Sequence, residues 1–232
     1  MKCHFCQQPL KKDISFSDLL GFHPILFNEC CLSCYEELVC LKKGNRCRYC
    51  GKNEEGIKDI CKDCVMWRKQ FPDFCLHHDY LYPYSEKMSD YFKEFKFLGD
   101  KEKGKVFAKD VYQSLYGFQS KGYLIVPIPL SKAGLRSRGF NQVEELLKQS
   151  HITYSCLLSK KDTTTKQTER MKEERILTKQ PFFVHRNKSK KIEKNKIMLV
   201  DDVYTTGRTL LHAYQCLLRF NPKEIGSFSL SR

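Results

Sequence analysis

One segment near the end of the sequence combines acidic, hydroxyl and glycine residues in an order that suits sugar-phosphate binding. An apolar stretch leads to Asp201 and Asp202, and a turn then supplies Thr205, Thr206, Gly207, Arg208 and Thr209. A strand that passes through a turn into a helix presents free N–H groups and the positive end of the helix dipole to a phosphate. The two carboxylates would repel a phosphate at contact, so they suit ribose hydroxyls and a nearby Mg²⁺ ion. An ordinary strand–turn–helix with threonine caps is the alternative interpretation.

The cysteines form a second group with a chemical pattern. Eleven of the thirteen lie between Cys3 and Cys75, and eight of them form four Cys-x-x-Cys pairs. This spacing directs two thiolates at one ion, and two pairs complete a tetrahedral zinc site. Pairing in sequence order predicts two structural Zn²⁺ sites, made by Cys3, Cys6, Cys31 and Cys34 and by Cys47, Cys50, Cys61 and Cys64. Cys30 and Cys40 are alternative ligands for the first site, and unmetallated or redox-active thiols are the alternative to both.

Two neighbouring features bear on the second zinc site. Gly51 directly follows Cys50, at a position where such a turn often needs an unhindered backbone. His77 and His78 also follow the cysteines closely. We expect these histidines in a surface turn, because the four cysteine pairs already fill two sites.

The segment after the cysteines begins with one short strand and two helices. Residues 75–84 are expected to form an irregular strand that includes Tyr80–Tyr82, and Ser85 is expected to cap a helix that ends near Leu98. A second helix places aromatic and aliphatic residues on one stripe between Phe107 and Phe118, which favours a core face over a nucleic-acid stacking surface. The intervening residues 99–106 match part of a P-loop but end in Val106 instead of Ser or Thr, so they predict a helix–helix turn.

Strand and helix patterns alternate from Gly122 onward. The expected order is a strand at 123–129, a basic loop at Lys132–Arg138, a helix around 140–147, strands at 152–158 and 197–203, a helix around 210–218 and a strand at 225–230. Such alternation predicts an α/β domain with a mostly parallel sheet covered on both faces, and ligands bind beyond the carboxyl ends of its strands. We expect a zinc-ribbon domain over residues 1–70 and the α/β domain over 71–232, with separate cores.

Composition limits the class of protein. Hydrophobic residues make up 41% of the 232 residues, enough for a sizeable core. The absence of an 18-residue apolar run and of a signal-peptide pattern predicts a cytoplasmic protein without membrane insertion. The formal charge of +14 falls to about +10 when eight thiolates bind two Zn²⁺ ions. An anionic partner is therefore expected, and the basic run His185–Lys196 is either a solvated loop or a contact for nucleic-acid phosphates.

The residue patterns resemble two related protein groups. Residues 197–209 resemble the 5-phosphoribosyl-1-diphosphate (PRPP) motif of type I phosphoribosyltransferases. More specifically, the chain resembles the ComF family of competence proteins. This resemblance rests on the double cysteine module, on Phe95–Asp100, on Val126–Leu130 with Arg136–Gln142, and on the spacing of Gln167, Arg175 and Phe183.

The resemblance implies a type I phosphoribosyltransferase-like fold with roles for particular residues. Asp201 and Asp202 would hold the ribose with Mg²⁺, residues 205–209 would hold the 5′-phosphate, and Arg136 or Arg138 would close over the pyrophosphate. It also implies a role in DNA uptake during natural transformation, with single-stranded DNA as a candidate ligand and a helicase-like competence ATPase as partner. An active phosphoribosyltransferase with an unidentified nucleobase acceptor is the alternative function.

Overall fold

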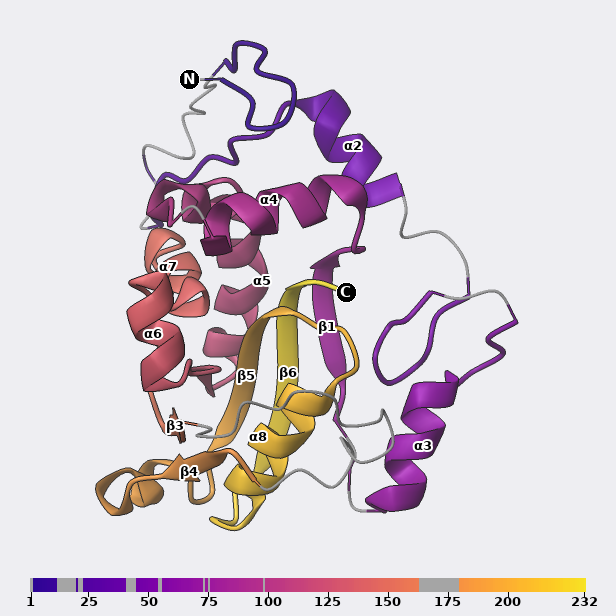
Figure 1. The fold of residues 1–232 in the computed structure, drawn as a ribbon, viewed down its shortest axis with the longest axis vertical. Helices are drawn as coiled ribbons and strands as arrows, with labels where there is room; N and C mark the ends of the chain where they lie inside the picture. Colours follow the sequence, from indigo (N-terminus) through magenta and orange to yellow (C-terminus); the bar gives the residue numbers. More distant parts are fainter. Residues whose placement is uncertain are drawn as a thin grey trace.

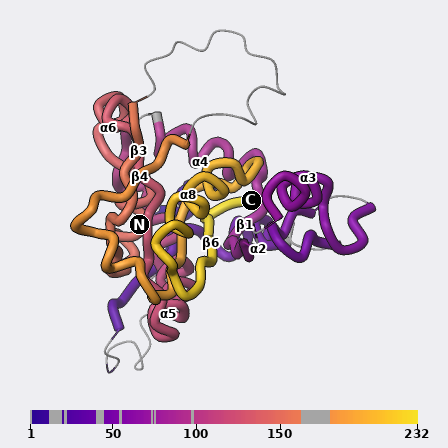
Figure 2. The backbone as a smooth tube through the Cα atoms, turned by 90° about the horizontal axis from the view of Figure 1, so that it is seen from below, coloured from indigo at the N-terminus to yellow at the C-terminus, as the bar shows by residue number. Residues whose placement is uncertain are grey.

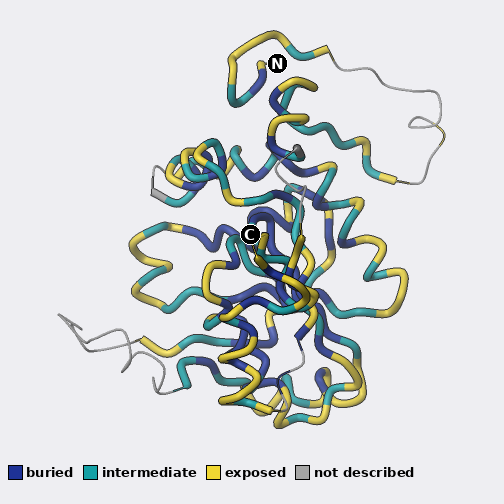
Figure 3. Tube along the Cα trace, turned by 90° about the vertical axis from the view of Figure 1, so that its right-hand side faces the viewer, coloured by how far each residue is buried: buried dark blue, intermediate teal, exposed yellow. Residues whose placement is uncertain are grey.

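The computed structural model describes residues 2–11, 20, 23–40, 45–53, 56–72, 74, 76–97, 99–162 and 180–232. Its centre is a four-stranded parallel sheet with the order β1-β6-β5-β2 (Figure 1). The strands are β1 (His78–Tyr82), β6 (Glu224–Ser231), β5 (Lys196–Val203) and β2 (Tyr123–Pro127). The middle of the sheet is buried (Figure 3), as expected for a parallel sheet covered on both faces.

Side chains of β5 alternate between two hydrophobic clusters, because successive residues of a strand point to opposite faces. Met198 and Val200 pack in the cluster that includes residues of α4 (Glu86–Phe97), α5 (Ala108–Ser120) and α7 (Gln142–Gln149). Ile197 and Leu199 pack in the other cluster with α8 (Arg208–Leu218) and a small sheet of β3 (Leu158–Lys160) and β4 (Phe182–Val184). The predicted α/β architecture is therefore confirmed.

The cysteine-rich segment contributes to both clusters. It contains α2 (Leu32–Cys40) and α3 (Lys62–Gln70), which lie at different places beside the sheet domain (Figures 1 and 2). Leu38 of α2 packs in the cluster with α4 and α5, and Trp67 of α3 packs in the cluster with α8. The expectation of separate cores is wrong, because α2 and α3 of the cysteine-rich segment each supply an apolar side chain to a cluster on one face of the sheet. The division at residue 70 remains a prediction.

The basic segment Lys132–Arg138 is a helix, α6, and not the predicted loop. The Ser131 hydroxyl caps its start by accepting from the Gly134 N–H at 3.1 Å. Gly139 ends it with φ +79°, a left-handed cap that donates to the Leu135 carbonyl. None of the residues of α6 is buried. The helix therefore has no apolar face, and its sequence lacks the periodic apolar pattern by which a helix is predicted.

The predicted strand at 152–158 is wrong for most of its length. Only Leu158 is in a strand, at the start of β3, which pairs antiparallel with β4. The Leu157 N–H binds the Ser155 carbonyl only two residues earlier at 2.9 Å, so the chain bends there and no ladder forms. The apolar residues that suggested a strand, such as Ile152, are buried in the core instead.

Other predicted elements match the structure closely. The Ser85 hydroxyl accepts from the Met88 N–H at the start of α4, and residues 101–105 form η1 (Lys101–Lys105), a 3₁₀ turn between α4 and α5. The basic run contains η3 (Arg186–Lys191), a 3₁₀ helix where a plain loop was one prediction. His78 is buried in β1, so its assignment to a surface turn is wrong, whereas His77 is exposed.

Gln167 and Arg175 lie outside the described residues, so the structure does not test their part in the resemblance to the ComF family. None of the described helices has the length and apolar character needed to cross a bilayer.

Candidate functional site

Asp201 and Asp202 lie at the carboxyl end of β5, in the middle of the sheet. Asp201 is half-buried, and its carboxylate accepts from the Asp202 N–H at 3.0 Å. Burial and the adjacent Asp202 charge raise the pKa of Asp201 to about 7, while Lys96 and Lys160 act in the opposite direction. The strand therefore presents two adjacent carboxylates, of which Asp201 has a raised pKa, at the edge where parallel sheets bind ligands.

A cation from a neighbouring helix compensates the acidic pair. Lys96, near the end of α4, forms an ion pair of 2.8 Å with Asp202, and both side chains are largely buried. The same ammonium group lies 4.7 Å from the centre of the Phe92 ring. Because the pair is shielded from solvent, its charges interact more strongly than a surface pair would. Lys96 thus fixes the position of one carboxylate.

The loop after β5 turns sharply at Gly207 before α8 begins. Gly207 has φ +77°, a conformation that L-residues with a β-carbon rarely adopt. A β-carbon there would lie 2.2 Å from the Tyr204 hydroxyl oxygen, and Tyr204 is itself buried. Both the backbone angle and the space therefore require glycine at the start of α8.

The hydroxyl residues of this loop face outward. Thr205, Thr206 and Thr209 are exposed, while Arg208 is half-buried in the first turn of α8. A hydroxyl can donate to an anion, and the first N–H groups of a helix have no carbonyl partner in the helix. The loop and α8 together offer several donors beside the two aspartates. The seven predicted binding residues are neighbours in the sequence, and their role in binding remains a prediction.

The carbonyl groups of the loop are held by two side chains from distant parts of the sequence. Arg232 Nη1 donates to the carbonyls of Tyr204 at 3.4 Å and Thr205 at 3.0 Å. Trp67 Nε1 donates to the Thr206 carbonyl at 2.8 Å. In a trans peptide the C=O and the following N–H point in opposite directions. The N–H groups of residues 205–207 therefore point away from Arg232 and Trp67.

The two candidate arginines are not part of this cluster. Arg138 donates to the Gln142 carboxamide at 3.0 Å, and Arg136 is exposed on α6. Among the described residues, no hydrogen bond or ion pair links either arginine to Asp201 or Asp202. Their predicted place above a leaving group remains a hypothesis about a ligand-bound form.

The second cysteine group has the geometry of a metal site. Its four thiols are buried, their sulfur atoms lie within 4.8 Å of one another, and Cys50 Sγ is 3.6 Å from Cys61 Sγ. Tetrahedral zinc–thiolate bonds of about 2.3 Å place sulfurs about 3.8 Å apart, so the group fits Zn²⁺. Gly51 has φ +68° in the turn that follows Cys50, as the sequence suggested. Cys61 and Cys64 come from the start of α3.

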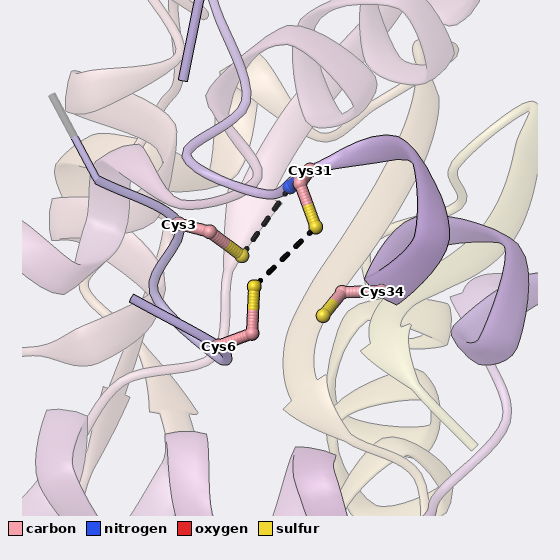
Figure 4. A group of neighbouring side chains, drawn as sticks. All are labelled: Cys3, Cys6, Cys31 and Cys34. Atoms are coloured by element: carbon pink, nitrogen blue, oxygen red, sulfur yellow. Dashed lines mark hydrogen bonds between the residues drawn. The ribbon is translucent and has the colours of Figure 1, made fainter. Parts of the chain in front are cut away.

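The first cysteine group repeats this plan in a more open form. Cys3 and Cys6 come from a turn and Cys31 and Cys34 from the start of α2, and their sulfurs gather around one centre (Figure 4). Cys6 Sγ lies 3.6 Å from Cys31 Sγ, but Cys6 is exposed. Cys30 stays outside the four and donates to the Cys31 carbonyl. The predicted grouping of all eight cysteines is confirmed, while the Cys40 side chain is not described.

Several residues of the site were not found by sequence reasoning. Lys96 lies inside the Phe95–Asp100 motif, which carried no role, and its partner Asp202 is more than one hundred positions away. Trp67 and Arg232 have no local pattern that points to the loop. Sequence reasoning assigned Tyr204 no role of its own within the binding segment, yet its ring fills the space that a side chain at position 207 would need.

Comparison with known proteins identifies a matching family model, similar relatives and a structural neighbour. The model of the phosphoribosyl transferase domain family matches residues 84–231. The chain is 35% identical to competence protein ComFC of Streptococcus pneumoniae over the full length of both, and 32% identical to that of Bacillus subtilis, covering 99% of this chain and 94% of the relative. Among solved structures, a hypoxanthine phosphoribosyltransferase from Staphylococcus aureus is 16% identical, covers 57% of this chain and 65% of its own, and has a TM-score of 0.37.

The matches to the two ComFC relatives extend over both the cysteine-rich segment and the sheet domain. The chain accordingly belongs to the ComFC group of ComF competence proteins, with a phosphoribosyl transferase domain at residues 84–231 and two four-cysteine groups before it.

Proposed function

We propose that the chain binds PRPP with Mg²⁺ at the carboxyl end of β5 and acts in DNA uptake during natural transformation. The observation that carries PRPP binding is the orientation of the loop after Asp202. Its carbonyls at residues 204–206 bind Arg232 and Trp67, so the next three N–H groups face the opposite side. N–H groups at the start of a helix are a favourable site for the 5′-phosphate.

The acidic residues bind the rest of the ligand in this proposal. Asp201 and Asp202 accept hydrogen bonds from the ribose hydroxyls, and their oxygens are hard ligands that suit Mg²⁺. The metal would neutralise charge on the diphosphate. Lys96 holds the Asp202 carboxylate in place and limits the repulsion between two neighbouring acids and an anionic ligand.

We also propose structural Zn²⁺ in both cysteine groups. The donor sets consist of four thiols each, with sulfur spacings that suit tetrahedral coordination. In each group, zinc would join the turn that contains the first two cysteines to the start of the helix that contains the other two.

The role in transformation is supported by the relatives, which are named competence proteins. In this proposal the protein is cytoplasmic, binds single-stranded DNA and works with a helicase-like competence ATPase. Lys190 and Lys191 are exposed on η3, where they can reach phosphates without reading bases.

A second candidate function is catalysis of phosphoribosyl transfer to a nucleobase. The complete set of sugar-phosphate residues at the end of β5 favours it. Turnover would need an acceptor beside carbon 1 of the ribose and release of pyrophosphate, which Arg136 or Arg138 would stabilise.

Calorimetric titration of the full chain with Mg²⁺–PRPP tests the proposal. We expect binding that Asp201→Asn weakens at least tenfold, because the ribose and metal contacts are lost, while inorganic phosphate binds as before. Asp79→Asn is the matched control, since Asp79 is an exposed acid on β1. A parent protein that does not bind Mg²⁺–PRPP, or an Asp201→Asn variant that binds it equally well, would contradict the proposal.

The same preparations separate the two functions. PRPP cleavage that depends on an added nucleobase and disappears in Asp201→Asn would identify a transferase. Binding without turnover across the common bases would favour the binding protein.

A further inference from the structure

The side chains that hold the loop carbonyls also belong to the surroundings of the second cysteine group. Arg232 Nη2 donates to Cys50 Sγ at 3.0 Å, and Arg232 Nε donates to the Cys50 carbonyl at 2.9 Å. Its guanidinium group lies 4.4 Å from the centre of the Tyr204 ring. One planar side chain therefore bridges a cysteine ligand and the loop that begins at Tyr204.

Trp67 makes a second link of the same kind. It is three residues after Cys64 on α3, nearly one helical turn away, and it is 4% exposed. Its indole N–H is bound to the Thr206 carbonyl. The position of Cys64 in the metal group thus sets the position of the donor that orients the peptide between Thr206 and Gly207.

We propose that Arg232 and Trp67 are positioning residues that couple the metal in the second cysteine group to anion binding by the loop. This inference rests on the proposed function. A metal ion bound in the second cysteine group would hold Cys50 and Cys64 in place, and through them Arg232 and Trp67. These two side chains donate to the carbonyls of residues 204–206, which sets the orientation of the three peptide groups. The N–H groups of residues 205–207 then face the phosphate. Coupling of this kind is reciprocal, so an anion in the loop tightens metal binding by the same factor.

The first cysteine group supplies an internal control. It has its own neighbouring cation, because Lys87 Nζ lies 3.9 Å from Cys34 Sγ and 2.5 Å from the Glu37 carboxylate. These contacts lead to α4 rather than to the loop. Loss of the Lys87 charge changes the surroundings of the first metal without touching residues 204–207.

Cadmium-113 NMR of the full chain tests the coupling, with one signal expected from each cysteine group. Lys87→Met should move the first signal and Arg232→Lys the second, which identifies them. Inorganic phosphate added to the parent should then move the second signal alone. Trp67→Phe and Arg232→Lys should bind phosphate about fivefold or more weakly, and Lys87→Met should bind it like the parent.

A role in folding alone would not produce the reciprocal effect. Phosphate should slow the release of metal from the second group in the parent, and this protection should shrink in Trp67→Phe, which keeps an aromatic ring but lacks the N–H donor. Equal protection of both groups, or unchanged phosphate affinity in both variants, would overturn the coupling.

A second readout separates this inference from the proposed function. The protein contains a single tryptophan, so one indole N–H signal reports on the bond to Thr206. Exchange of zinc for the larger cadmium should move the loop amide signals in the parent but not in a Trp67→Phe/Arg232→Ala variant. If the loop amide signals of the parent do not change when cadmium replaces zinc, the coupling is overturned. If these signals change but the protein does not bind phosphate, the coupling is supported and the proposed function is contradicted.

Discussion

Lys96 of α4 and Asp202 of β5 form an ion pair of 2.8 Å that joins a helix on one face of the sheet to the candidate binding edge. The pair also influences Asp201, because the Lys96 charge opposes the rise of the Asp201 pKa that burial and Asp202 cause. One lysine therefore acts on both carboxylates.

Lys96→Met should raise the Asp201 pKa above about 7. Binding of Mg²⁺–PRPP requires the ionised acid in our proposal, so its pH midpoint should move upward. Carbon-13 NMR of the carboxyl groups and calorimetry at several pH values measure these effects. Lys93→Met is the control, because Lys93 pairs with Asp90 at the surface of the same helix. An unchanged Asp201 titration would contradict the expected influence of Lys96.

The raised Asp201 pKa also affects the stability of the ligand-free protein. The folded pKa of about 7 lies above the ordinary value of 3.8, so the folded state binds more protons between these values. The stabilising contribution of Asp201 is full below pH 3.8 and is lost as the pH rises toward 7. Asp201→Asn should remove this decline in unfolding free energy, measured by denaturant titration at pH 5 and 7.

Gly207→Ala should destabilise the protein more than Gly139→Ala. Both glycines have nearly the same left-handed φ, which costs an alanine about 1 kcal/mol. A β-carbon at Gly139 meets nothing within 4 Å, whereas one at Gly207 meets the buried Tyr204 ring. We expect an additional loss of about 1–3 kcal/mol at Gly207, with loss of phosphate binding. Equal unfolding free energies for the two variants would show that Tyr204 moves away freely.

Acid should destabilise the protein partly through His78. Burial and the Arg232 charge lower the pKa of His78 to about 3, and the two ring nitrogens lie 2.9 Å from the hydroxyl oxygens of Ser227 and Ser229. The unfolded state takes up a proton near pH 6.5, so this stability is lost as the pH falls below that value. His78→Gln should remove about 1 kcal/mol of the difference between pH 7 and 5.5, and the exposed His77→Gln should not.

Metal analysis should find about two Zn²⁺ ions per chain, released to a chelator in two phases. The first group should lose its ion sooner, because Cys6 is exposed while all four cysteines of the second group are buried. Cys31→Ser should remove the fast phase and Cys61→Ser the slow phase. Release in the opposite order would mean that burial does not control access to the ions.

Lys190→Glu with Lys191→Glu should weaken binding of single-stranded DNA and flatten its salt dependence. Loss of two phosphate contacts should reduce the slope of log affinity against log salt by about 1.4. Lys109→Glu with Lys121→Glu makes the same change of charge at two exposed residues, one on α5 and one at its C-terminal cap, and serves as the control. Equal effects of the two double variants would indicate a general charge effect and no contact at η3.

The sequence predicted those parts of the fold whose signals are local. The stripe of α8 and the run of β5 each lie within about a dozen residues, and the binding segment 201–209 joins them directly. The cysteine pairs were predictable for the same reason, since the Cys-x-x-Cys spacing is local, and pairing them in sequence order gave the two groups that the structure shows. Helix α6 was missed because its caps, Ser131 and Gly139, are its only signals.

The remaining parts depend on contacts between distant residues. Trp67 and Thr206 are 139 positions apart, and nothing near either one encodes their hydrogen bond. The buried state of His78 follows from its β6 partners, Ser227 and Ser229, which pattern analysis of β1 alone cannot supply. Tertiary packing also decided that Ile152 enters the core without forming a strand.

The pairing of β1 with β6 has a consequence for synthesis of the protein on the ribosome. His78 of β1 lies opposite Ser227 of β6, which is synthesised about 150 residues later. During synthesis β1 therefore has no β6 to pair with until the end of the chain is made. At ordinary elongation rates of about 5–20 residues per second, that wait lasts roughly 7–30 s. All eight cysteines of the two groups precede β1 in the chain, so they are exposed to metal ions during this interval, whereas Arg232 and the loop at Thr205 are made only near its end. Nascent chains should therefore acquire zinc before they acquire a completed binding edge.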